Sequence, residues 1–283
     1  MSESTSEQTL RSAISPVIDE LWEVRSELSP SDSEARSEVI TAIDALDTGA
    51  ARVASVPADG GPAVVDERAK RAILLAFRVL PMSVSQVGDF RYNDRVPLKT
   101  RLDGVRALPG SIARWGSYVA PGVVLMPSFV NIGAYVDSGT MVDTWATVGS
   151  GAQIGRNVHL SGGVGIGGVL EPPSAVPVVV EDDCMIGSRC MVVEGARVRT
   201  GAVLGAGAFL GPSTHVIDVQ TGSELPRGEI PPWSVAVSGT RPRSFPGGEF
   251  GMPCVLVLKR LPEGERHNKA ELNSILRDHG VEA

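Results

Sequence analysis

The side chains that could do chemistry are few and lie mostly in the middle of the chain. Asp143, in the stretch MVDTWATVG, could orient a nitrogen nucleophile or accept its proton. Arg106, in GVRALPG, could bind a carboxylate bidentately, because its guanidinium is planar. His159 and His215 could act as general bases. Each also has a plainer interpretation: a turn-forming aspartate, a solvated or ion-paired arginine, and histidines at a subunit interface.

Other chemistries are disfavoured by residue type and spacing. The four histidines do not supply three ligands at related positions, so we predict no metal site. The three cysteines form no CxxC motif and too few pairs for a disulfide framework, and structural thiols are favoured for Cys184 and Cys190. GVGIGG (163–168) superficially matches a dinucleotide fingerprint, but no helix is expected to follow it.

Composition limits the class of protein further. The chain has 283 residues, of which 42% are hydrophobic and 21% charged, which is typical of a folded protein with a core. The net charge is −7 and aromatic residues make up 5%, so nucleic-acid binding is not expected. The first ten residues do not form a signal peptide, and no apolar run could span a bilayer. We therefore expect a cytoplasmic protein with no membrane partner.

A six-residue repeat organises the central chain. Apolar residues recur at every sixth position from Ile112 to Ile166 and again from Val180 to Val216. Small residues and glycines lie between them. This period fits neither a helix nor an isolated strand. It predicts a parallel β-helix with triangular coils, in which the repeated aliphatic residue points inward and glycine occupies tight corners.

The repeat divides the chain into four parts. An amphipathic stripe from Leu10 to Leu28, a second helix ending near Gly49 and a third over 66–79 predict an N-terminal helical domain over residues 1–90. Residues 91–111 are expected to connect it to a β-helix over 112–239, with loops at 168–179 and 218–229. Residues 240–283 should form a C-terminal extension, with a strand over 254–258 and a helix around 269–277.

The local sequence resembles a known family. The stretch over 125–172, with ALDTGAARV (45–53), AILLAFR (72–78), RYNDRVPLK (91–99) and IPPWSVAVSG (230–239), is similar to tetrahydrodipicolinate N-succinyltransferases of the hexapeptide-repeat acyltransferase superfamily. The resemblance covers nearly the whole chain in order. It implies a left-handed parallel β-helix with an N-terminal α-helical domain and a short strand–helix extension. It also implies a homotrimer with active sites between subunits.

The resemblance implies an activity and site residues. The family transfers the succinyl group of succinyl-CoA, a co-substrate and not a bound cofactor, to the nitrogen of tetrahydrodipicolinate. The product is N-succinyl-2-amino-6-oxopimelate, in lysine and diaminopimelate biosynthesis, by direct attack in a ternary complex. Arg106 matches the family's substrate-binding arginine, and Asp143 its active-site aspartate. For His159, a place at the subunit interface is then favoured over a general base.

One departure from the family pattern concerns the mechanism. Many members carry a glutamate where Met191 stands in IGSRCMVVEG (186–195), and it is proposed to help proton transfer. Met191 cannot move protons, so either Asp143 suffices, Glu194 substitutes for the glutamate, or the chemistry differs.

Coenzyme A should meet glycines and cations. Gly163, Gly165 and Gly167 would permit close approach of the pantetheine arm. Arg241 and Lys259, with Arg243 and Arg260, are candidates to bind its phosphates. Two alternatives stay open: a related acyltransferase that uses acetyl-CoA or another cyclic imine, and a non-catalytic β-helix scaffold.

Overall fold

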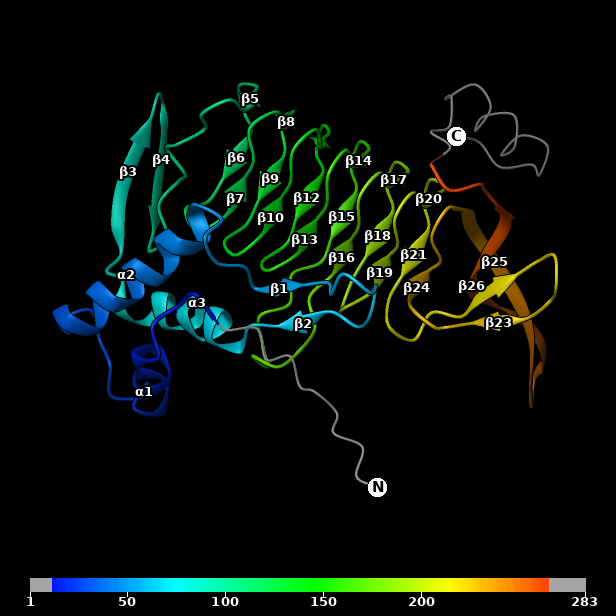
Figure 1. Ribbon diagram of the computed structural model, residues 1–283, viewed down its shortest axis with the longest axis horizontal. Helices are drawn as coiled ribbons and strands as arrows, with labels where there is room; N and C mark the ends of the chain where they lie inside the picture. Colours follow the sequence, from blue (N-terminus) through cyan, green and yellow to red (C-terminus); the bar gives the residue numbers. More distant parts are fainter. Residues whose placement is uncertain (1–11, 265–283) are drawn as a thin grey trace.

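The computed structural model describes residues 12–264, and its body is a β-helix with helices at one end and a long hairpin at the other (Figure 1). The helices are α1 (Val17–Glu23), α2 (Ser33–Asp47) and α3 (Glu67–Val79). They bury a core that includes Ile18, Ile43 and Ile73, and this core also takes in Ile132 of the β-helix. The N-terminal helices are therefore packed directly against the coils.

The helix boundaries follow local signals. The Asp66 side chain accepts a hydrogen bond from the Ala69 N–H and caps α3, which ends where Pro81 forces Leu80 into an extended conformation. The predicted first helix is too long. Helix α1 ends at Glu23, because Arg25 and Glu27 make turn bonds to residues three before them instead of continuing the helix. Leu10 lies outside the described residues.

Three parallel sheets form the sides of the β-helix, and the chain visits them in a fixed order. The first face contains β5 (Arg106–Ala107), β8 (Val124–Leu125), β11 (Met141–Val142), β14 (His159–Leu160), β17 (Met185–Ile186) and β20 (Val203–Leu204). The second contains β6 (Ile112–Ala113), β9 (Phe129–Val130), β12 (Thr147–Val148), β15 (Gly165–Ile166), β18 (Met191–Val192) and β21 (Phe209–Leu210). The third contains β7 (Tyr118–Val119), β10 (Tyr135–Val136), β13 (Gln153–Ile154), β16 (Val179–Val180), β19 (Arg197–Val198) and β24 (Glu229–Ile230).

The six-residue period predicted the core correctly over most of the β-helix. From Val130 to Val216 every predicted inward residue is at most 2% exposed. The first three predicted positions were wrong by one residue: Ala113, Val119 and Leu125 point inward in place of their predecessors. The cause is a segment between Leu125 and Val130 that is one residue short of a full repeat. The coils also begin earlier than residue 112, since β5 already pairs with β8.

Both excursions from the β-helix leave at the edge between the second and third faces. The first lies between β15 and β16, and the second, between β21 and β24, contains β22 (Val216–Asp218) and β23 (Glu224–Leu225). Fully buried Lys70 of α3 donates to the Ala175 carbonyl at 2.5 Å and so ties the first loop to the helices. Before the coils, β4 (Phe90–Asp94) pairs with β3 (Ser83–Val87), so this hairpin crosses the predicted boundary between residues 90 and 91.

The described residues close with a two-stranded hairpin. Strand β25 (Ser234–Phe245) continues the first face by pairing with β20, and β26 (Gly248–Arg260) returns antiparallel to it and also pairs with β22. The predicted strand over 254–258 is part of β26, which is much longer than expected. The predicted helix around 269–277 lies outside the described residues.

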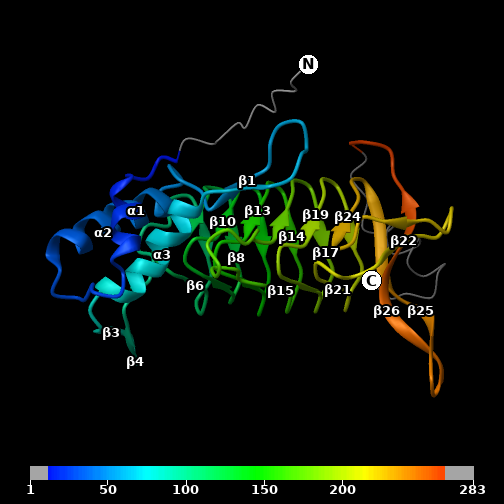
Figure 2. The same cartoon turned by 90° about the horizontal axis from the view of Figure 1, so that it is seen from below.

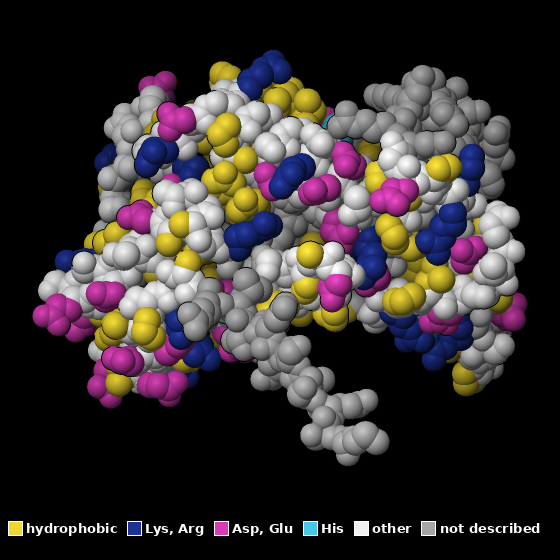
Figure 3. Space-filling view, viewed as in Figure 1, with side chains coloured by type: hydrophobic (Ala, Val, Ile, Leu, Met, Phe, Trp, Pro, Cys, Tyr) yellow, Lys and Arg dark blue, Asp and Glu magenta, His cyan; other side chains and the backbone are white. Residues whose placement is uncertain are grey.

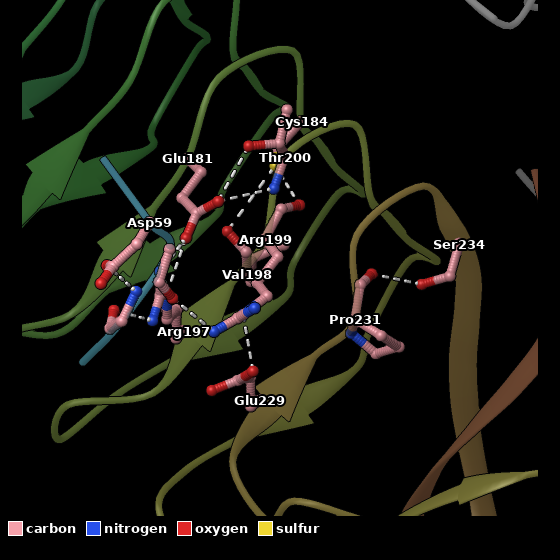
Figure 4. A network of polar contacts seen from close by, with 12 residues as sticks. Asp59, Glu181, Cys184, Arg197, Val198, Arg199, Thr200, Glu229, Pro231 and Ser234 are labelled. Carbon is pink, nitrogen blue, oxygen red and sulfur yellow. Dashed lines mark hydrogen bonds and ion pairs between the residues drawn. The ribbon is translucent and has the colours of Figure 1, made fainter. Parts of the chain in front are cut away.

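A strap formed by residues 54–65 runs along the third face (Figure 2). Its ends pair as β1 (Ala54–Ser55) and β2 (Val64–Val65). Arg197, with a side chain 9% exposed, donates to the carbonyls of Gly61 at 2.8 Å and Gly60 at 3.2 Å while it pairs with Glu181 (Figure 4). These contacts join residues far apart in the sequence and tie the N-terminal domain to the third face.

Candidate functional site

Asp143 and His159 lie together at the edge between the first and second faces. Their strands pair in parallel, with Met141 opposite His159, and Asp143 follows β11 directly. Asp143 Oδ2 is 3.5 Å from His159 Nε2, and the two side chains are 30% and 40% exposed. The sequence analysis favoured a subunit-interface position for His159 over a general base, and it did not pair His159 with Asp143. The signal that it missed is the 18-residue coil, which sets residue 159 beside residue 141.

The Asp143 carboxyl is held in its charged form. The Thr144 backbone N–H donates to Oδ1 at 2.6 Å, and this bond, helped by His159, keeps the pKa of Asp143 below its usual value although partial burial opposes the shift. Asp143 is therefore an anion at neutral pH. It can accept hydrogen bonds from a substrate nitrogen and stabilise positive charge on His159.

Arg106 lies on the same face as this pair. It begins β5, whose partner strand β8 pairs in turn with β11, so two coils separate Arg106 from Met141. That separation is about 10 Å along the axis at the usual inter-strand spacing. The Arg106 side chain is exposed, and no hydrogen bond or ion pair occupies it within residues 12–264. A dicarboxylate lying along the edge could meet both Arg106 and Asp143.

Glu194 lies elsewhere. It follows β18 at the edge between the second and third faces, with φ 50°, and lines a cavity of about 930 Å³ beside α3 and the loop over 169–177. One chain therefore does not bring Glu194 to Asp143. A smaller cavity of about 390 Å³ lies under the strap and is also remote from Asp143.

The predicted glycines lie beneath side chains of the next coil. A Cβ on Gly163 would stand 2.7 Å from Arg189 Cδ, and one on Gly165 would overlap the Met191 sulfur. A Cβ on Gly167 would stand 3.1 Å from Val193 Cα. Side chains and backbone of the next coil thus occupy the space that a Cβ would take at these glycines, and the place of the pantetheine arm stays a prediction. Arg189, which the sequence analysis did not single out, lies on the Asp143 edge.

The predicted phosphate-binding cations lie on the C-terminal hairpin, at the end where Lys and Arg side chains gather in Figure 3. Arg241 is 3.3 Å from Glu224 and Arg260 is 3.5 Å from Asp218. Arg243 lies over the Phe245 ring, and Lys259 is exposed. Arg241 and Arg260 already have carboxylate partners, which leaves Lys259 and Arg243 freer to bind an anion.

The thiols are not placed for catalysis. Cys184 and Cys190 point into the β-helix and are at most 1% exposed, and burial raises the pKa of Cys190 to about 11. Within residues 12–264 no group of His, Cys, Asp or Glu side chains could hold a metal ion. No helix of this described part is long and apolar enough to cross a membrane.

Known proteins match this chain along nearly its whole length. The family model "Tetrahydrodipicolinate N-succinyltransferase N-terminal" matches residues 13–79, and "Hexapeptide repeat of succinyl-transferase" matches 177–212. A Paramagnetospirillum magneticum protein named 2,3,4,5-tetrahydropyridine-2,6-dicarboxylate N-succinyltransferase is 49% identical over 94% of this chain and 99% of its own. The chain belongs to the tetrahydrodipicolinate N-succinyltransferase family. Its fold is accordingly the left-handed parallel β-helix of hexapeptide-repeat proteins.

A second curated relative has the same name, and one solved structure is also similar to part of the chain. A Dechloromonas aromatica protein of the same name is 46% identical over 92% of this chain and 97% of its own. A solved structure titled as a putative N-succinyltransferase from Campylobacter jejuni is 22% identical, covers 59% of this chain and 46% of its own, and gives a TM-score of 0.40. The family membership rests on the sequence relatives.

Proposed function

We propose that this chain transfers the succinyl group of succinyl-CoA to the nitrogen of tetrahydrodipicolinate and yields N-succinyl-2-amino-6-oxopimelate for lysine and diaminopimelate biosynthesis. The observation that carries the proposal is the ionised Asp143 beside His159, on the same face as Arg106. A substrate with two carboxylates and one nucleophilic nitrogen fits a guanidinium and a carboxylate on one face.

The chemistry is a direct attack. Water first adds to the C=N bond of the cyclic imine, which gives a hydroxyl on the ring carbon and an N–H. The nitrogen then attacks the thioester carbonyl, so a C–N bond forms, the C–S bond breaks, and the nitrogen loses its proton. The ring opens when the hydroxyl-bearing carbon becomes the carbonyl of the oxo acid and its bond to nitrogen breaks, and the nitrogen takes the hydroxyl proton. Asp143 orients the nitrogen, and His159, whose Nε2 is 3.5 Å from Asp143 Oδ2, can take the proton that the nitrogen loses and pass it to the departing thiolate. Met191 does not prevent this route, since His159 supplies a second titratable group.

The active unit we propose is a homotrimer with sites between subunits. Trp145 is 73% exposed and Phe209 58%, and both lie at or on the second face. Large exposed apolar side chains are typical of an interface. Glu194, which is on another edge of its own chain, would reach an Asp143 site only from a neighbouring subunit.

The deciding experiment is a thiol-release assay with tetrahydrodipicolinate and either succinyl-CoA or acetyl-CoA. Asp143→Asn should lower kcat by about 10²- to 10⁴-fold, the usual contribution of a positioned acid or base. Asp137→Asn is the matched control. Asp137 also follows an inward valine and accepts a bond from the next backbone N–H, at 2.7 Å, but it lies on another edge. It should change kcat less than about threefold.

The outcomes separate the alternatives. Turnover with succinyl-CoA that Asp143→Asn abolishes supports the proposal. Turnover with acetyl-CoA only would assign a related acyltransferase, the second candidate that Met191 suggests. No turnover with either donor from a folded protein would contradict both.

A further inference from the structure

Arg189 lies on the same edge as Asp143 but further along the axis. The backbone ladder runs from Thr144 to Gly163, whose N–H donates to the Thr144 carbonyl at 2.9 Å. In the next coil, the Arg189 N–H donates to the Gly162 carbonyl at 3.1 Å. Two coils therefore separate Arg189 from Thr144. Arg106 is two coils away from Asp143 in the opposite direction, so the pair Asp143–His159 lies between two arginines.

The Arg189 side chain lies back over the preceding coil, at Gly163. Its Cδ, Nε and Cζ atoms all lie within 2.9 Å of the point where a Cβ of Gly163 would stand. Gly163 has φ +71° and no side chain, which gives the arginine this place. The guanidinium is thus directed one coil back, toward the coil of Asp143.

This guanidinium is available to a ligand. Arg189 is exposed, and within residues 12–264 no carboxylate or carbonyl pairs with it. Met191, two residues later, lies over Gly165 in the same way and is 43% exposed. A cation beside an apolar thioether suits a carboxylate that ends a short aliphatic chain.

The order of the two arginines and Asp143 along the β-helix axis indicates which substrate supplies the carboxylate that Arg189 would bind. Arg106 lies on the side of Asp143 toward the helical domain. Arg189 lies on the other side, toward the hairpin that carries Lys259 and Arg243. If the acceptor dicarboxylate binds Arg106, Arg189 is left for the second substrate. That substrate is the acyl donor, which approaches from the end of the β-helix that carries the hairpin.

We propose that Arg189 binds the terminal carboxylate of the acyl donor while Met191 contacts its methylene carbons, so that these two residues select a succinyl group. The inference rests on the proposed function, because it names the donor specificity of that site. It assigns Met191 a contact role and requires no proton transfer from it.

The test compares succinyl-CoA with butyryl-CoA, which has the same chain length but no carboxylate. Both turnover with tetrahydrodipicolinate and equilibrium binding of each donor are measured on full-length protein. In Arg189→Gln the ratio of succinyl to butyryl kcat/KM should fall about 10- to 100-fold, as expected for one charge-assisted pair. Butyryl transfer itself should change less than about threefold.

Two further variants sharpen the result. Gly163→Ala keeps the charge of Arg189 but puts a methyl group in its place, so it should lower the same ratio. Arg156→Gln removes an exposed arginine, 65% exposed, from another edge and should leave the ratio unchanged. Circular dichroism and the oligomer size check that each variant folds.

Several results would overturn the inference. An unchanged donor ratio in Arg189→Gln would do so, as would wild-type protein that does not distinguish the two donors. A rise in KM for tetrahydrodipicolinate that is equal with both donors would assign Arg189 to the acceptor instead. If the wild-type protein shows no turnover, the proposed function fails, and the binding ratio alone then decides the role of Arg189.

Discussion

Replacing Arg197 by methionine should open the strap over residues 54–65 without unfolding the β-helix. The substitution keeps the aliphatic stem but removes the bonds to the carbonyls of Gly60 and Gly61 and the ion pair with Glu181. Each bond from a charged donor contributes about 1.5–3 kcal/mol. Glu181 keeps the bonds from the Thr200 N–H and hydroxyl, at 3.0 and 2.8 Å, so the penalty for the unpaired carboxylate is small.

The net effect on the strap should be about 3 kcal/mol, since Arg199 still donates to the Gly60 carbonyl at 2.9 Å. Hydrogen exchange of the strap peptide, measured by mass spectrometry, should therefore speed up about 100-fold. Arg199→Met removes one bond to the strap and should give about a tenfold increase. Exchange within threefold of wild type in Arg197→Met would refute the reasoning, as would equal loss of protection throughout the β-helix.

Three other predictions concern buried or paired groups. Lys70→Met removes the bond to the Ala175 carbonyl, so limited proteolysis should reveal new cleavage within residues 169–177, and an uncut loop would contradict this. With its pKa at about 11, Cys190 should resist iodoacetamide at pH 8 in the native protein and react in urea, whereas rapid native labelling would show that it is accessible. Burial acts to raise the pKa of Asp19, but hydrogen bonds from Arg68 and Arg71 outweigh it and lower that pKa below 3.8. The stabilisation that ionised Asp19 gives the folded protein is present above pH 3.8. It is lost as the pH falls through the lowered pKa of Asp19 in the folded protein. The denaturant midpoint of Asp19→Asn should therefore lie below that of wild type at pH 7 and approach it as the pH falls below 3.8, and a constant difference would contradict this.

The six-residue period predicted the coils because inward residues are enclosed on all sides and must be apolar. It failed at the first coils for a physical reason. Ile112–Ala113, Tyr118–Val119 and Val124–Leu125 are each two apolar residues in a row, so hydrophobicity does not say which one points inward. Only the short step from Leu125 to Val130, seen in the strand register, decides it.

The site was predictable in part for similar reasons. Asp143 and Arg106 came from a resemblance, and the structure places them on one face. The contact of His159 with Asp143 could be predicted only from the 18-residue length of a coil, because the two residues lie in neighbouring coils. Arg189 was harder to find. The loop before β16 makes the step from Gly165 to Met191 longer than one regular coil. The 18-residue spacing therefore does not reveal that Arg189 lies over Gly163 and Met191 over Gly165.

The placement of these insertions supports the edge between the first and second faces as the place of the proposed site. Both excursions leave between the second and third faces, and the strap covers the third face. Between the first and second faces the chain turns with the same short connection in the coils of β11, β14, β17 and β20. Side chains along that edge therefore keep a regular spacing from Asp143 to Arg189. Loops can vary at the edge between the second and third faces without moving these groups. An insertion that lengthens a turn between the first and second faces should disrupt the site even where the core remains intact.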